Sequence, residues 1–263
     1  MKIAFSIPLS MSLFNDSSLS KQTCMTSKHD WLTARPIAHR GLHDAGKQIY
    51  ENTLSACKVA LIKNFSMEVD LHLASDGIPV VFHDRTLERM CNDPRQVRAL
   101  DSNELSNITI GSSNDYIAPL SELLELIDGN AGLILELKGV VNEDDGFVES
   151  VARCLADYQG PVALMSFNHW ILKDARALAP HLTLGLVAEG NERQHSSHRA
   201  IVQECNVDFV TYDQNDLPNK FCEEFRATGK PLLCWTIKDA ERMKRSLNYV
   251  DQVTFEQFDP DNI

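Results

Sequence analysis

The stretch SMEVDLHLASDGIPVVFHD, residues 66–84, predicts a β-strand over 66–73 followed by a tight return. Apolar and polar residues alternate over 66–73, and this period of two is that of side chains on the two faces of a strand. The turn residues Ser75, Asp76 and Gly77 then precede a second apolar run, 79–83. Only about five residues separate the two runs, whereas a parallel crossover takes a dozen or more. We therefore expect 79–83 to fold back beside 66–73.

Further apolar, β-branched runs alternate with helical patterns along the rest of the chain, which is typical of βαβ units and a parallel sheet. These runs are 36–39, 133–138, 162–167, 182–187, 208–212, 232–237 and 252–255. With 66–73 they make eight strands, which fit a closed (β/α)8 TIM barrel of the α/β class. An open doubly wound sheet would instead carry a glycine-rich fingerprint, and the sequence has none. Active sites in such barrels lie at the carboxyl ends of the strands.

Helical periods connect the predicted strands. An apolar stripe from Leu54 to Leu61 can be capped by Asn52 or Thr53, and further stripes follow Ser121 and occupy 148–155. Residues 84–119 are rich in Asp, Asn, Ser and Arg and contain no strong strand, which predicts a small polar insertion over one face of the barrel. We expect one TIM-barrel domain over 31–263, preceded by a disordered extension, 1–30, whose apolar start only faintly resembles a signal peptide.

Composition limits the possible functions. The chain has 263 residues, 43% of them hydrophobic, and a formal net charge of −12. Such a charge disfavours broad attraction to nucleic acid or anionic lipid, so an anionic ligand would need local cations or a metal ion. Seven scattered cysteines without a C-x-x-C pair favour a reducing, cytoplasmic compartment. No apolar run is long enough for a transmembrane helix, so we expect no stable membrane insertion.

Two predicted strands place acidic side chains on the same inward face of the barrel. Glu68 and Asp70 alternate with apolar residues in 66–73, and Glu136 and Lys138 do so in 133–138. If these strands are neighbours, the three carboxylates converge as oxygen ligands, which suit Mg²⁺ or Ca²⁺ rather than zinc. The alternative is a structural ion-pair cluster built on Lys138.

Two histidines lie at predicted strand ends. His39 ends the first strand beside Arg40, and His83 ends the return strand beside Asp84. A lone histidine at a strand end is usually a packing residue. Two of them beside a carboxylate cluster can instead take a proton from a nucleophile and give one to a leaving alcohol near neutral pH.

In their order and spacing these motifs resemble the glycerophosphodiester phosphodiesterase family. The matching segments are HRG at 39–41, ENT at 51–53, EVDLHLASDGIPVVFHD at 68–84 and ELK at 136–138, with weaker matches SF at 166–167 and WT at 235–236. The resemblance covers nearly the whole predicted barrel. The family's usual Thr-Asp-x-Pro ending near the eighth strand is stretched here, over residues 254–260.

The resemblance implies a metal-dependent hydrolase that releases glycerol 3-phosphate from a small glycerophosphodiester, with one divalent cation, Mg²⁺ or Ca²⁺. It implies roles for ten residues: Glu68, Asp70 and Glu136 as metal ligands, His39 and His83 as the acid/base pair, Arg40 and Lys138 as phosphate contacts, Glu51 and Asn52 at the mouth, and Trp235 against the glycerol.

Two alternative functions compete with this one. The same barrel and metal could cleave a lysophospholipid, as a lysophospholipase D, or a sphingolipid headgroup, and an exposed apolar lip at the mouth would favour this substrate. A non-catalytic phosphoester-binding barrel would lack a catalytic histidine or a metal carboxylate, and this sequence lacks none of the five.

Overall fold

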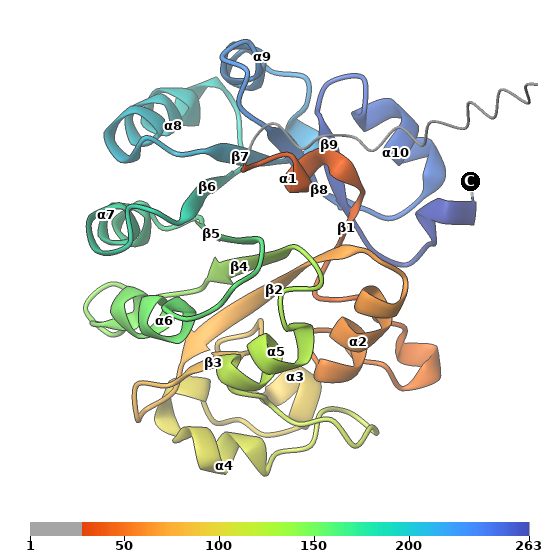
Figure 1. Ribbon diagram of the computed structural model, residues 1–263, viewed down its shortest axis with the longest axis vertical. Helices are drawn as coiled ribbons and strands as arrows, with labels where there is room; N and C mark the ends of the chain where they lie inside the picture. The colour runs from red at the N-terminus through yellow and green to blue at the C-terminus, as the bar shows by residue number, and fades with distance from the viewer. Residues whose placement is uncertain (1–27, 263) are drawn as a thin grey trace, which may run out of the picture.

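The computed structural model describes residues 28–262, and within them eight parallel strands close into a barrel (Figure 1). The strands are β1 (Ile37–Ala38), β2 (Ser66–Leu73), β4 (Leu133–Leu137), β5 (Val162–Ser166), β6 (Thr183–Ala188), β7 (Phe209–Asp213), β8 (Leu232–Ile237) and β9 (Gln252–Phe255). They follow the order β1-β9-β8-β7-β6-β5-β4-β2, and pairing of β1 with β2 completes the ring. The predicted TIM barrel is confirmed. Several strands end a residue or two earlier than predicted, so that His39 and Lys138 lie just beyond them.

The return strand β3 (Pro79–Val81) pairs antiparallel with β2, as predicted, with Leu71 opposite Val81. On its other side β2 pairs parallel with β4, and the register sets Asp70 opposite Glu136. Because a slip of one residue would turn these carboxylates to the opposite face of the sheet, this register fixes the position of the site.

Helices surround the barrel in Figure 1. They are α2 (Leu54–Ile62), α5 (Leu120–Ile127), α6 (Phe147–Leu155), α7 (His169–Leu178), α8 (Glu192–Cys205), α9 (Lys220–Arg226) and α10 (Ala240–Ser246). Thr53 caps α2, since its side chain accepts a hydrogen bond from the amide of Ala56 at 3.1 Å. Helix α5 begins at Leu120, slightly before the position predicted from Ser121.

Two apolar layers hold the barrel together. The larger lies between strands and helices, and a smaller one fills the interior, where Ile37, Phe209 and Leu233 meet. The short helix α1 (Trp31–Ala34) adds Trp31 and Leu32 to this interior layer. Because α1 directly precedes β1, these side chains close the amino-terminal end of the barrel and leave the carboxyl ends of the strands for the site.

The insertion at 84–119 contains short helices and an apolar core of its own. It contains α3 (Glu88–Cys91), the 3₁₀ turn η2 (Val97–Ala99) and α4 (Ser102–Ser106), which starts with a capping box between Asp101 and Glu104. Its apolar residues form a separate small core against Val80 and Phe82. The insertion is therefore a packed layer beside the return strand.

The predicted extension, 1–30, lies mostly outside the described residues. Among residues 28–262, no helix is both long and apolar enough to cross a membrane.

Candidate active site

Three buried carboxylates meet at the carboxyl end of β2 and β4. Glu68, Asp70 and Glu136 have relative exposures of 1%, 1% and 7%. One oxygen of each lies within 4.8 Å of the others, which is close enough for the three to share a metal ion. The alternation read from the sequence thus places all three predicted ligands together.

Burial and neighbouring charges shift the pKa values of these three carboxyl groups in different directions. Burial, reinforced by repulsion from Asp70 and Glu136, raises the pKa of Glu68 well above its usual value. Burial also raises the pKa of Glu136 to about 7, although the charge of Lys138 acts in the opposite direction. Burial would likewise raise the pKa of Asp70, but the charges of Lys138 and Arg40 lower it to about 2.

A divalent cation fits this cluster. Among the described residues, Oε1 of Glu68 is buried without a hydrogen-bond partner. Leaving a carboxylate oxygen in that state costs about 1–3 kcal/mol or more. Three carboxylate oxygens form the donor set that hard cations such as Mg²⁺ and Ca²⁺ prefer.

Two cationic side chains border the carboxylates. The Nζ atom of Lys138 lies 3.1 Å from Oδ1 of Asp70 and 2.5 Å from Oε1 of Glu136. The Nε atom of Arg40 lies 3.2 Å from Oδ2 of Asp70. The ion-pair cluster that was the alternative interpretation is therefore present in part. It leaves Oε1 of Glu68 unpaired, so ion pairing alone does not account for the site.

The HRG segment needs its glycine. Arg40 and Gly41 have φ angles of 55° and 76°, in the left-handed region that favours glycine. A Cβ atom on Gly41 would lie 2.9 Å from backbone and side-chain atoms of Ala56 in α2. The turn therefore lies directly against the helix and aims the amide of Arg40 at Oε2 of Glu68, at 3.0 Å.

Glu51 and Asn52 support the cluster from the side. Asn52 is buried and hydrogen-bonds Asp70 twice, through Nδ2 to Oδ2 at 2.8 Å and through Oδ1 from the amide of Asp70 at 3.0 Å. Glu51 accepts from Arg40 at 2.7 Å and from Arg89 of the insertion at 2.7 Å. Sequence reasoning missed Arg89. It was one arginine among several in a polar segment, without a motif to mark it.

Both predicted histidines reach the site. His39 follows β1, and its Nε2 lies 3.9 Å from Oε2 of Glu68. His83 follows β3, and its Nδ1 lies 2.7 Å from Oδ1 of Asp84. Burial lowers the pKa of His39, although a hydrogen bond to Glu256 acts in the opposite direction. Glu256 is a second residue that sequence reasoning missed.

One cavity of about 240 Å³ is lined by both histidines and by the charged side chains of Arg40, Glu68, Glu136 and Lys138. Met165, Phe167, Val187 and Trp235 add apolar surface to the same cavity. The rings of Phe167 and Trp235 meet edge to face with centroids 5.5 Å apart, and Phe167 is 38% exposed. The cavity thus suits a ligand with an anionic group and a small organic part.

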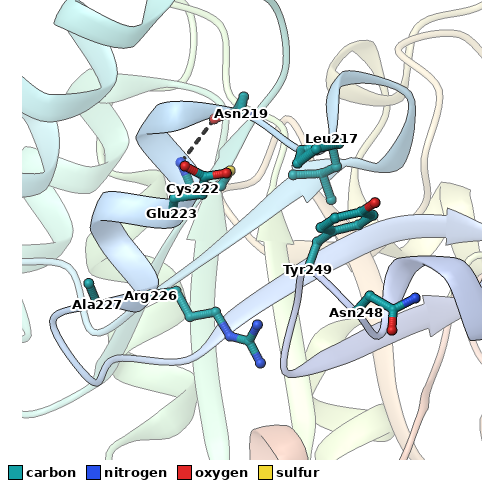
Figure 2. A pocket seen from close by; sticks show the side chains of 9 residues that line it. Leu217, Asn219, Cys222, Glu223, Arg226, Ala227, Asn248 and Tyr249 are labelled. Carbon is teal, nitrogen blue, oxygen red and sulfur yellow. Dashed lines mark hydrogen bonds between the residues drawn. The ribbon is translucent and has the colours of Figure 1, made fainter.

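Another cavity, of about 390 Å³, lies beside α9 and holds none of the predicted residues (Figure 2). Two of its polar side chains are already engaged within the fold. Asn219 caps α9 by accepting from the amide of Cys222 at 2.9 Å, and Arg226 pairs with Asp251 at 2.8 Å. The chemistry therefore belongs to the smaller cavity at the strand ends.

A parallel barrel that gathers three carboxylates, two histidines and two cations could hold a metal ion and an anionic ligand, and comparisons with known proteins specify the class of protein further. Residues 39–254 match the model of the glycerophosphoryl diester phosphodiesterase family. A glycerophosphodiester phosphodiesterase from Caldanaerobacter subterraneus subsp. tengcongensis is 29% identical over 223 residues, which cover 80% of this chain and 88% of that protein.

Solved structures agree with this match. A phosphodiesterase from Oleispira antarctica, in complex with its product sn-glycerol-3-phosphate, aligns with a TM-score of 0.76 and 26% identity over 84% of this chain and 92% of that one. A protein from Silicibacter pomeroyi, described as a putative glycerophosphoryl diester phosphodiesterase, shares the fold, with a TM-score of 0.73 at 21% identity over 84% and 89% of the two chains. The chain belongs to the glycerophosphoryl diester phosphodiesterase family and is an enzyme of that class.

Proposed function

We propose that this enzyme hydrolyses glycerophosphodiesters to glycerol 3-phosphate and an alcohol in a reaction that requires a divalent cation. The observation that carries this proposal is the buried carboxylate trio, with Oε1 of Glu68 unpaired, at a cavity that His39 and His83 also line. Glu68, Asp70 and Glu136 would hold the cation. When bound, it would neutralise phosphodiester charge and stabilise the crowded transition state at phosphorus.

The protein's own residues supply the remaining steps. Arg40 and Lys138 border the trio and would contact the phosphate, and Trp235 would pack against the glycerol. One of His39 and His83 would remove a proton from the attacking oxygen, and the other would protonate the leaving alcohol. The attacking oxygen is either a glycerol hydroxyl, which gives a cyclic phosphate that water opens, or water itself.

The first test is release of glycerol 3-phosphate from glycerophosphocholine and glycerophosphoethanolamine with and without chelator, followed by separate restoration of Mg²⁺ or Ca²⁺. We expect release that the chelator abolishes and one of the cations restores. His83→Ala should lower turnover 10²-fold or more with metal affinity unchanged. Turnover within about tenfold of wild type would remove His83 from the acid/base pair.

The exposed Phe167 beside Trp235 is the observation that favours a lipid substrate as the second candidate. A lysophospholipid could lay the start of its acyl chain against these rings. Assays with lysophosphatidylcholine and with a sphingolipid of the same headgroup distinguish the candidates. Cleavage of either lipid, without cleavage of the soluble diesters, would overturn the first proposal in favour of the second.

A further inference from the structure

Glu256 lies next to His39 because the first and last strands of the barrel pair with each other. Strands β1 and β9 pair in parallel, with Ala38 opposite Phe255. His39 directly follows β1 and Glu256 directly follows β9, so the two residues lie side by side. Backbone hydrogen bonds fix both ends, from the amide of His39 to the carbonyl of Phe255 and from the amide of Glu256 to the carbonyl of Ile237, each at 2.9 Å.

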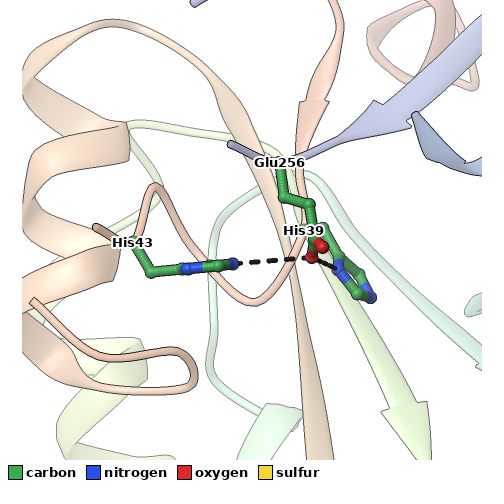
Figure 3. Close-up of side chains that lie close together, drawn as sticks. All are labelled: His39, His43 and Glu256. Carbon is green, nitrogen blue, oxygen red and sulfur yellow. Dashed lines mark hydrogen bonds and ion pairs between the residues drawn. The ribbon is translucent and has the colours of Figure 1, made fainter. Parts of the chain in front are cut away.

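The carboxylate of Glu256 contacts the ring nitrogen of His39 that faces away from the carboxylate trio. Its Oε2 lies 2.6 Å from Nδ1 of His39 (Figure 3). Nε2 of the same ring lies 3.9 Å from Oε2 of Glu68. A carboxylate only accepts hydrogen bonds, so a hydrogen bond between these two groups requires the proton on Nδ1. This leaves Nε2 on the pocket side, able to take up or deliver a proton.

Several cationic or polar groups keep Glu256 charged and in place. Lys238 Nζ lies 2.8 Å from Oε1, the side-chain Nε2 of Gln257 donates to the same oxygen at 3.2 Å, and His43 Nε2 lies 3.6 Å from Oε2. Burial alone would raise the pKa of this carboxyl. The hydrogen bond from His39 and the contacts with His43 and Lys238 instead hold its pKa far below the usual value.

His39, His43 and Glu256 are close enough to one another to bind a metal ion, but the surroundings argue against this interpretation. The ammonium group of Lys238 already pairs with the same carboxylate, and a second cation there would be repelled. The cluster is better described as a hydrogen-bonded support for one imidazole.

We propose that Glu256 is a positioning residue that fixes the ring orientation and the Nδ1–H tautomer of His39, so that Nε2 faces the reacting phosphodiester. This inference rests on the proposed function, in which His39 exchanges a proton with substrate. A carboxylate that orients a histidine through its second nitrogen is a general device for holding imidazole in one tautomer.

Glu256→Gln tests this role because Gln keeps the size of the side chain and removes its charge. We expect kcat to fall about 10–100-fold with KM nearly unchanged and with Mg²⁺ affinity, measured by calorimetry, equal to that of wild type. Asp259→Asn is the matched control, since this carboxylate nearby in sequence pairs with Lys63, outside the cavity, and should leave kcat unaltered.

The double variant with His39→Ala separates positioning from a general structural effect. If Glu256 acts through His39, then Glu256→Gln causes no further loss once the imidazole is gone. An equal loss of kcat in both backgrounds, or no loss in the wild-type background, would overturn the proposal.

The tautomer can also be observed without turnover. Ring ¹⁵N shifts of His39 in the Mg²⁺-loaded protein should show the proton on Nδ1, and Glu256→Gln should give a mixture of tautomers. A proton on Nε2 in the wild-type protein would refute the positioning role. Because this measurement is independent of catalysis, failure of glycerophosphodiester hydrolysis would count against the proposed function alone.

Discussion

Replacing Glu68 with Gln should make the metal-free enzyme more stable while it abolishes the response to metal. Oε2 of Glu68 accepts from the amide of Arg40 at 3.0 Å, and a Gln oxygen can keep that bond. The other oxygen is buried and unpaired beside two carboxylates, to which a Gln amide could donate. Removing an uncompensated buried polar or charged oxygen should contribute about 1–3 kcal/mol to stability. For a chain of this size that corresponds to a rise in Tm of roughly 2–10 °C.

The assay is thermal unfolding of wild type and Glu68→Gln with chelator and with saturating Mg²⁺ or Ca²⁺. At 100 times its Kd, a cation that binds only the folded state stabilises the wild type by about 2.7 kcal/mol, and the variant should show no such gain. Glu149→Gln is the control, because this exposed carboxylate only pairs with Arg153 along α6 and should change stability by less than about 0.5 kcal/mol. A less stable metal-free Glu68→Gln that still gains stability from metal would refute the reasoning.

Three further changes test other parts of the fold. Gly41→Ala should cost about 1–3 kcal/mol by urea unfolding, because its Cβ would meet Ala56 at 2.9 Å and its φ is 76°. Burial, helped by neighbouring histidines, lowers the pKa of His198 to about 4 in the folded protein. As the pH falls below 6.5, this imidazole therefore gains a proton in the unfolded chain but not in the folded one. Urea midpoints should therefore report a loss of about 2 kcal/mol between pH 7 and 5, and His198→Phe should reduce that loss. Arg89→Gln should cost less than about 1 kcal/mol in the same assay, because Arg89 is 47% exposed where it pairs with Glu51.

The carboxylate trio could be predicted because its determinants are local. Alternation within 66–73 and 133–138 decides which side chains point inward, and only the adjacency of the two strands had to be assumed. The structure supplies that adjacency, with Asp70 opposite Glu136. The two histidines were predictable for a related reason, since residues at the carboxyl ends of barrel strands face the same mouth.

Glu256 and the core of the insertion depend on contacts that no local pattern reveals. Glu256 meets His39 across 217 residues, through the pairing of the first and last strands. In the sequence, the segment 254–260 shows only that the family's usual ending is altered. Nothing in it connects Glu256 with His39. In the insertion, Leu87, Val97 and Leu105 follow neither a helical nor a strand period, and packing alone brings them together.

The charges of the site explain how an acidic enzyme can bind an anion. In the fully ionised form that a bound cation requires, the three carboxylates against Arg40 and Lys138 carry one net negative charge. Without the cation, this ionised form of the site would repel a phosphodiester, in agreement with the net charge of −12. A divalent cation would reverse the sign and leave one positive charge, which matches the single negative charge of a phosphodiester. Substrate binding, and not only turnover, should consequently depend on metal, and equilibrium dialysis of glycerophosphocholine with His83→Ala, with and without Mg²⁺, would show whether it does.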